Sequence, residues 1–79
     1  MLELNKDNIL KSNVKTINQF KILEYLKKEL NVFEFRLFLY DKNTIKVIDK
    51  NNECGYFIYK DNEIIFKEYI KEKEQEIQL

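Results

Sequence analysis

The 79-residue sequence has no histidine, no proline and no tryptophan, and it contains a single cysteine and a single glycine. Without histidine, no Ser-His or Cys-His pair can activate a nucleophile. One cysteine cannot form an internal disulfide, and without histidine it cannot build a usual zinc site. The lone glycine, Gly55, excludes the glycine-rich loops that hold nucleotide phosphates. We therefore expect a protein that is not an enzyme and that uses no metal and no cofactor.

Long apolar runs and an excess of one charge are also missing. No stretch is apolar enough to span a membrane and residues 1–5 lack the basic start of an export signal, so we expect a cytoplasmic protein without membrane contact. Fourteen basic residues balance fourteen acidic ones, so the chain as a whole does not attract nucleic acid or anionic lipid. Its length suits one domain, 1–79. A chain of this size is near the lower limit at which a hydrophobic core is stable without disulfides or a structural metal ion.

The most informative stretch is 32–67, where apolar and polar side chains alternate with the period of a β-strand. Clusters of Asp, Asn, Lys and Glu at 41–43, 51–53 and 61–62 predict turns. Together they predict a four-stranded antiparallel meander in the order 1-2-3-4. Its strands are expected at 32–40, 44–50, 54–60 and 63–67.

The three turns also predict the register of the strands. The first sets Tyr40 opposite Thr44, the second sets Lys50 opposite Cys54, and the third sets residue 59 opposite 64. With this register, the large apolar side chains gather on one inner face. Its members are Phe35, Leu37, Leu39, Ile45, Val47, Phe57, Tyr59, Ile64 and Phe66.

A helix is predicted at 16–31, because Thr16 and Gln19 match a capping box and the apolar residues from Phe20 to Leu30 share one broad face. Asn31 suits the left-handed position that follows a helix. This helix is the natural cover for the inner face of the sheet. The whole chain is thus predicted to have an α+β fold.

The two ends of the chain give weaker patterns. In residues 1–15, Leu2 and Leu4 fit a short edge strand, and Asp7 fits the cap of a short helical turn. Residues 68–79 are rich in Lys, Glu and Gln, which predicts a charged C-terminal helix.

The outer face of the predicted sheet carries more apolar side chains than a solvated face needs. The predicted cross-strand rows are Phe38, Lys46, Ile58 and Ile65, then Arg36, Ile48, Tyr56 and Lys67, then Tyr40, Thr44, Lys60 and Glu63. Contiguous apolar area of this kind marks an interaction surface. The candidate partner-binding residues are Arg36, Phe38, Tyr40, Lys46, Ile48, Tyr56, Ile58, Lys60, Ile65 and Lys67.

Three interpretations of this outer face compete. The C-terminal helix could fold over it and give a closed three-layer domain. The face could instead bind a protein partner or a second copy, with Phe38, Tyr40 and Tyr56 as aromatic anchors. It could also bind single-stranded nucleic acid, because basic side chains lie among the aromatic ones. The zero net charge and the single arginine count against nucleic acid.

We therefore expect a small binding protein that acts by occupying the surface of a protein partner. Thirteen of the fourteen basic residues are lysine, and Asn and Ile are abundant, a composition typical of an AT-rich genome or its phage. Small size, no cofactor and this composition suit a phage or mobile-element inhibitor of a host defence enzyme, in the style of an anti-CRISPR protein, although no motif is shared. The expected mechanism is steric, with the sheet face favoured over the acidic tail (Glu68, Glu72, Glu74 and Glu76).

Overall fold

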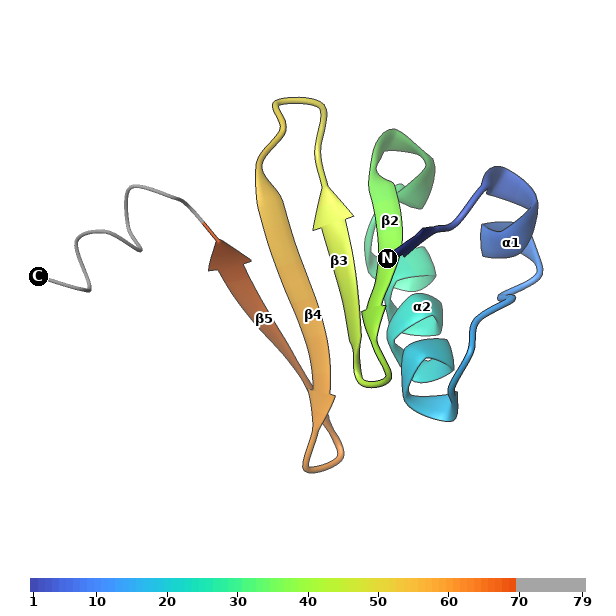
Figure 1. Cartoon of the computed structure of the whole chain (residues 1–79), viewed down its shortest axis with the longest axis vertical. Helices are drawn as coiled ribbons and strands as arrows, with labels where there is room; N and C mark the ends of the chain where they lie inside the picture. The colour runs from blue at the N-terminus through green and yellow to red at the C-terminus, as the bar shows by residue number, and fades with distance from the viewer. Residues whose placement is uncertain (70–79) are drawn as a thin grey trace, which may run out of the picture.

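The computed structural model describes residues 1–69 and shows an α+β fold, in which helices pack against an antiparallel sheet (Figure 1). The elements are β1 (Leu2–Glu3), α1 (Lys6–Leu10), α2 (Ile17–Glu29), the 3₁₀ turn η1 (Val32–Glu34), β2 (Arg36–Asp41), β3 (Thr44–Ile48), β4 (Cys54–Lys60) and β5 (Glu63–Tyr69). The strands lie in the order β1-β2-β3-β4-β5, and neighbours are antiparallel. The predicted meander is confirmed, but the predicted count of four strands is wrong, because β1 adds a fifth beside β2. Within these residues, no helix is long and apolar enough to cross a membrane.

Helix α2 begins at the predicted capping box. The Thr16 hydroxyl accepts a hydrogen bond from the Gln19 amide, and the Gln19 side-chain carbonyl accepts one from the Thr16 amide, both at 3.1 Å. The last helical residue is Glu29, and Leu30 is already extended, with ψ 158°. Asn31 has φ −82°, so the prediction of a left-handed residue there is wrong.

Residues 32–34, predicted as the start of the first long strand, form η1 instead. The Glu34 amide donates to the Asn31 carbonyl at 3.0 Å, and the Asn31 side-chain amide donates to the Glu34 carboxylate at 2.7 Å. Asn31 thus closes the turn through its backbone and its side chain, and the turn places Val32 in the core. Strand β2 consequently begins at Arg36 rather than at Val32.

The N-terminal residues contribute to both the sheet and the core. After β1, the Leu4 amide donates to the Leu37 carbonyl at 2.8 Å, which continues the pairing with β2. Helix α1 is capped by Asn5, in a reciprocal capping box, so the prediction of Asp7 as the cap is wrong. Leu4 and Ile9 are buried, and residues 1–15 therefore help to close the β1 end of the core.

The turn between β2 and β3 contains a bulge. Asp41, rather than Tyr40, pairs with Thr44, and the register shifts between Leu39 and Asp41. The Asp41 carboxylate accepts a backbone amide of the turn and so favours a two-residue loop. The predicted pairing of Tyr40 with Thr44 is wrong, whereas that of Leu39 with Ile45 is confirmed.

The loop between β3 and β4 is longer than predicted. The Asp49 carboxylate accepts backbone amides within the loop, including that of Glu53 at 3.0 Å, and these bonds tie the loop to Asp49. As a result Ile48, and not Lys50, pairs with Cys54. The register of β4 on β3 is therefore two residues away from the predicted one. Because the shift is even, every side chain stays on its predicted face.

The turn between β4 and β5 matches the prediction. Asp61 and Asn62 have φ 53° and 65°, as the two central residues of a type I′ hairpin require, and Tyr59 pairs with Ile64. Strand β5 continues to Tyr69, so the predicted helix cannot begin at residue 68. The rest of that predicted helix, 70–79, lies outside the described residues.

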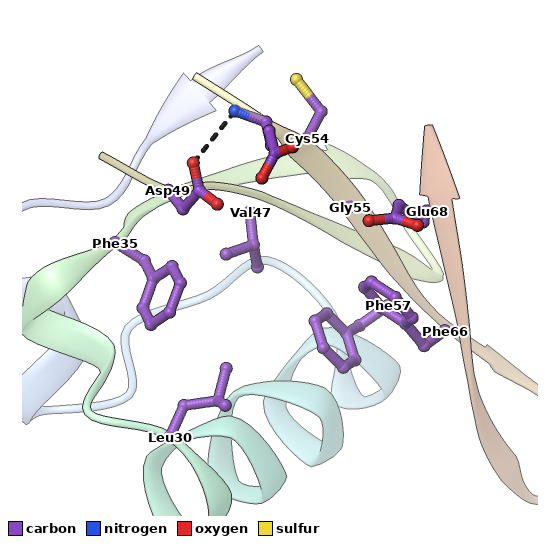
Figure 2. A pocket seen from close by; sticks show the side chains of 10 residues that line it. Leu30, Phe35, Val47, Asp49, Cys54, Gly55, Phe57, Phe66 and Glu68 are labelled. Atoms are coloured by element: carbon purple, nitrogen blue, oxygen red, sulfur yellow. Dashed lines mark hydrogen bonds between the residues drawn. The ribbon is translucent and has the colours of Figure 1, made fainter. Parts of the chain in front are cut away.

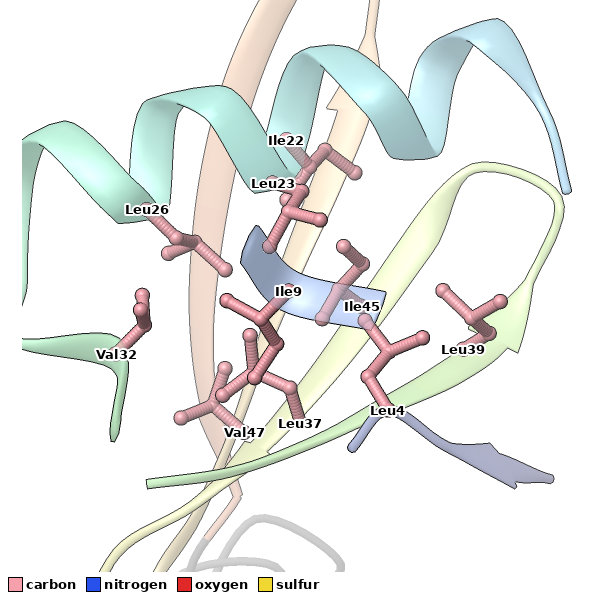
Figure 3. Packing of buried hydrophobic residues seen from close by; sticks show 10 residues of the cluster. All are labelled: Leu4, Ile9, Ile22, Leu23, Leu26, Val32, Leu37, Leu39, Ile45 and Val47. Carbon is pink, nitrogen blue, oxygen red and sulfur yellow. The ribbon is translucent and has the colours of Figure 1, made fainter. Parts of the chain in front are cut away.

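The core lies between α2 and the sheet and includes side chains from the N-terminal segment (Figure 3). Ile22, Leu23 and Leu26 on α2 and Ile45 on β3 are 0% exposed. The full set of buried apolar residues is Leu4, Ile9, Ile22, Leu23, Leu26, Val32, Leu37, Leu39, Ile45 and Val47.

Helix α2 does not cover the whole inner face. Phe57, Tyr59 and Ile64 are only half-buried, and Phe66 is 53% exposed, although all four were predicted to lie beneath the helix. A helix with its side chains is about 10 Å wide, whereas strands lie about 4.8 Å apart, so one helix covers two to three strands. Since α2 packs mainly on β3 and β4, the inner face of β5 extends beyond it (Figure 1).

Candidate functional site: the outer sheet face

The predicted site residues all lie on β2 to β5, on the sheet face opposite α2. Pairing places Phe38, Lys46, Tyr56 and Lys67 in one row across the four strands. Tyr56 and Lys67 stand where Ile58 and Ile65 were predicted, because the β3–β4 register is shifted. The remaining rows are Arg36, Ile48 and Cys54, then Thr44, Ile58 and Ile65, and finally Lys60 and Glu63.

Aromatic rings and basic groups of this face contact one another. The rings of Tyr40 and Tyr56 meet edge to face with centroids 5.0 Å apart. The Lys46 ammonium lies 5.8 Å from the Tyr56 ring centre, and the Arg36 guanidinium lies 5.1 Å from that of Phe38. Tyr40 lies at the bulge, and the shifted β3–β4 register places Tyr56 opposite Lys46, in the row where Ile58 was predicted.

Arg36 is held in place by β1. Its Nε and Nη2 atoms donate to the two Glu3 carboxylate oxygens at 3.1 and 3.0 Å, a bidentate ion pair between β2 and β1. The hydrogen bond from Arg36 lowers the pKa of Glu3, and the same bond raises the pKa of Arg36. The positive charge over Phe38 is thus positioned by a strand that was only weakly indicated by the sequence.

A shallow hollow lies beside the Tyr40–Tyr56 contact, with a volume of about 270 Å³. Its lining comes from three neighbouring strands and the end of β2, and Thr44 is almost fully buried there. Tyr40 at the hollow is 50% exposed, and nearby Ile65 is 37% exposed. The lining residues are Tyr40, Asp41, Thr44, Tyr56, Ile58 and Lys67.

A second hollow lies on the inner face, where α2 ends, and sequence reasoning missed it (Figure 2). It has a volume of about 200 Å³, an apolar floor that includes Phe57 and Phe66, and carboxylates at its rim. The two rings lie 4.8 Å apart, and the Phe66 ring extends over Gly55, which has no Cβ to block it. A glycine inside a predicted strand often marks such a close approach and was the available signal.

Two polar side chains that line the inner hollow have surroundings that can be described. Asp49 at the inner hollow accepts backbone amides of its own loop, which is a structural role. Cys54 is a half-buried free thiol. Within residues 1–69 no three Cys, Asp or Glu side chains are grouped as metal ligands would be.

No protein-family model, no curated protein and no solved structure matches this chain. The chemistry of the two sheet faces is therefore the basis for inferring a function.

Proposed function

We propose that this protein is a non-enzymatic binding domain whose outer sheet face docks on the surface of a protein partner. The supporting observation is a band of half-exposed apolar side chains that crosses β2 to β5 and has no cover among residues 1–69. Phe38, Tyr56 and Ile58 are half-buried in this band, and Tyr40 and Ile65 are more exposed. Apolar bands with polar margins are typical of protein interfaces.

The charges of the outer face indicate the charge of the partner surface that it would bind. Arg36, Lys46, Lys60 and Lys67 outnumber the acidic residues Glu3, Asp41 and Glu63 on and around it, although the whole chain is neutral. We infer a partner with an apolar protrusion that fills the hollow beside the Tyr40–Tyr56 contact, surrounded by acidic side chains. Tyrosine at the centre of an interface is a frequent energetic anchor, because its large ring is ordered at low entropic cost.

Single-stranded nucleic acid is the less supported ligand. Bases stack on free faces of aromatic rings, with about 1–3 kcal/mol for each stacked base. Here Arg36 and Lys46 already lie against the rings of Phe38 and Tyr56, and Tyr40 contacts Tyr56 edge to face. A base would have to displace these contacts, whereas a protein partner can pack around them.

The hypothesis of a mobile-element inhibitor is one form of this proposal. A sheet face without catalytic groups can inhibit an enzyme by occupying the surface that the substrate or a subunit needs. An inhibitor of this kind would block the enzyme at a ratio of one to one. An excess of the isolated enzyme surface would relieve the inhibition, and no cofactor would be required.

The experiment compares Tyr40→Asp/Tyr56→Asp with Ile17→Asp, a control on the solvent-exposed start of α2, where Ile17 is 74% exposed. A partner is captured with the wild-type chain, purified, and titrated against each variant by calorimetry. The outer-face variant is expected to lose binding by about thirtyfold or more, on the order of the roughly 2–4 kcal/mol of hot-spot residues, and the control to bind normally.

Two results would overturn the proposal. Undiminished binding by the outer-face variant would place the interface elsewhere. Unfolding of that variant, seen by circular dichroism, would show that the face is covered in the intact chain, because a buried unpaired carboxylate is strongly destabilising. Loss of oligonucleotide binding in Lys46→Glu/Lys60→Glu, with a reduced salt dependence, would favour nucleic acid instead.

A further inference from the structure

The two edges of the sheet differ in length. At one edge β1 contributes only Leu2–Glu3, whereas at the other β5 extends over Glu63–Tyr69. No strand among residues 1–69 pairs with the outer side of β5. A long, partly apolar edge strand is a ready template for another strand, and proteins usually shorten, cover or pair such edges.

The hydrogen-bond pattern shows which backbone groups of β5 face this edge. The Tyr59 amide donates to the Asn43 carbonyl at 2.8 Å, so the odd-numbered residues of β4 direct their N–H and C=O groups toward β3. The even-numbered residues of β4 therefore bond to β5, and their partners there include Ile65. It follows that Ile64 and Phe66 direct their N–H and C=O groups away from β4, to the free edge.

We propose that two copies of this chain pair through antiparallel β5 strands, across a two-fold axis at Ile65. In this register Ile64 of one copy lies opposite Phe66 of the other, and the outward-facing backbone groups of these residues bond reciprocally. Glu63 lies opposite Lys67 of the second copy, twice by symmetry. Apolar residues meet apolar ones on both faces, and opposite charges meet at both ends.

Other symmetric registers fit the sequence of β5 poorly. An axis at Phe66 sets Ile65 opposite Lys67 and Ile64 opposite Glu68. An axis at residue 67 sets two lysines against each other, which is destabilising. An axis at Ile64 sets Glu63 opposite Ile65. Only the Ile65 axis matches both the charges and the apolar side chains, and this self-complementarity identifies the second strand as another copy of the chain.

The exposed apolar side chains of β5 support the same arrangement. Phe66 is 53% exposed on the inner side, where α2 does not reach, and Ile65 is 37% exposed on the outer side. In the proposed dimer, Phe66 packs beside Ile64 of the second copy, and the two Ile65 side chains meet at the axis. The ten-stranded sheet thereby joins the uncovered inner strips of both copies between their α2 helices.

A charge exchange tests both the dimer and its register. The wild-type chain is expected to be a dimer by light scattering at high micromolar concentration. Glu63→Lys sets lysine opposite lysine, and Lys67→Glu sets glutamate opposite glutamate, so each variant alone is expected to dimerise at least about tenfold more weakly. A mixture of the two variants restores both opposite-charge pairs, and we expect a heterodimer with near wild-type affinity.

A covalent test uses Ile65→Cys in a Cys54→Ser background. Ile65 would face its own copy in a non-hydrogen-bonded pair, where Cα atoms lie about 4.5 Å apart, within the range that disulfides span. Ile65→Cys is expected to oxidise to a disulfide-linked dimer, whereas Ile17→Cys on α2 is expected to form no disulfide-linked dimer, as non-reducing electrophoresis shows. A wild-type chain that stays monomeric at all concentrations would overturn the dimer. Single charge variants that dimerise like the wild type would overturn the register.

Discussion

The close contact between Gly55 and Phe66 predicts how Gly55→Ala changes the free energy of unfolding. The sign of this change is expected to reverse when Phe66 is replaced by alanine. A Cβ atom at residue 55 would lie 2.5 Å from Cε1 of Phe66, closer than two carbon atoms can approach. Gly55→Ala therefore forces the Phe66 ring away from the sheet. Because that ring is 53% exposed, it can move outward without disturbing the buried core.

The magnitude follows from the area that the ring loses. A fully buried phenylalanine removes about 150–250 Å² from water, so a half-buried one removes about 100 Å². At about 25 cal/mol per Å², complete displacement of the ring costs about 2.5 kcal/mol, and partial displacement costs about half of that. Replacing a glycine inside a strand by alanine returns about 0.5–1 kcal/mol. We expect Gly55→Ala to destabilise the fold by about 0.5–2 kcal/mol.

With Phe66→Ala as background, the ring is absent and only the backbone gain remains. Gly55→Ala is then expected to stabilise the fold by about 0.5–1 kcal/mol. The assay is urea unfolding followed by circular dichroism for the four chains of the double-mutant cycle, at concentrations where light scattering gives a monomer. If Gly55→Ala has the same sign in both backgrounds, the ring does not lie over Gly55 and the reasoning fails.

Two further predictions concern the core and the first strand. Leu23→Ala should lower the free energy of unfolding by about 2–5 kcal/mol, because Leu23 is 0% exposed under α2; a urea midpoint that hardly moves would contradict this packing. The hydrogen bond from Arg36 lowers the pKa of Glu3 below its unfolded value, so the ion pair stabilises the fold above that unfolded value and is lost as the pH falls through the lowered pKa. Glu3→Gln should therefore melt below the wild type at about pH 7, and the difference in Tm should shrink as the pH falls below the unfolded pKa of Glu; a Tm difference that is independent of pH would count against this assignment.

Features determined by residues close together in the sequence could be predicted. The capping box at Thr16 and Gln19 and the positive φ angles at Asp61 and Asn62 both follow from local hydrogen bonding and sterics. The face on which each site residue lies was also predictable, because alternation along a strand does not depend on the exact pairing.

Features that depend on competing hydrogen bonds were not predictable. Nothing in the sequence decided whether the Asp49 carboxylate would bind amides of the following loop, yet those bonds shift β4 by two residues and bring Tyr56 opposite Lys46. The side chain of Asn31 likewise favours a 3₁₀ turn over a strand at residues 32–34. The composition of the face was thus predicted, but the neighbours within it were not.

The inner face is wider than the single helix that was predicted to cover it. A single helix cannot span five strands, so the last strand needs either another element of the chain or another molecule. A strand that paired with the edge of β5 would cover the exposed Phe66 ring and would also form hydrogen bonds with the outward-facing backbone groups. We therefore assign the edge of β5 to a second copy and the outer face to a different partner.

A dimer through β5 and a partner bound at each outer face together determine the stoichiometry of the complex. Pairing at Ile65 places the outer faces of both copies on one continuous sheet, with the two Tyr40–Tyr56 hollows related by the two-fold axis. A partner bound at one hollow leaves the other open, so complexes of two binding domains with two partners are the expected assembly. Glu63→Lys should then bind partner with unchanged contacts at the hollow but in a one-to-one complex. Light scattering of the complexes separates the two effects: loss of the dimer halves the total mass and keeps the partner mass per binding domain, whereas loss of the outer interface lowers the partner mass per binding domain.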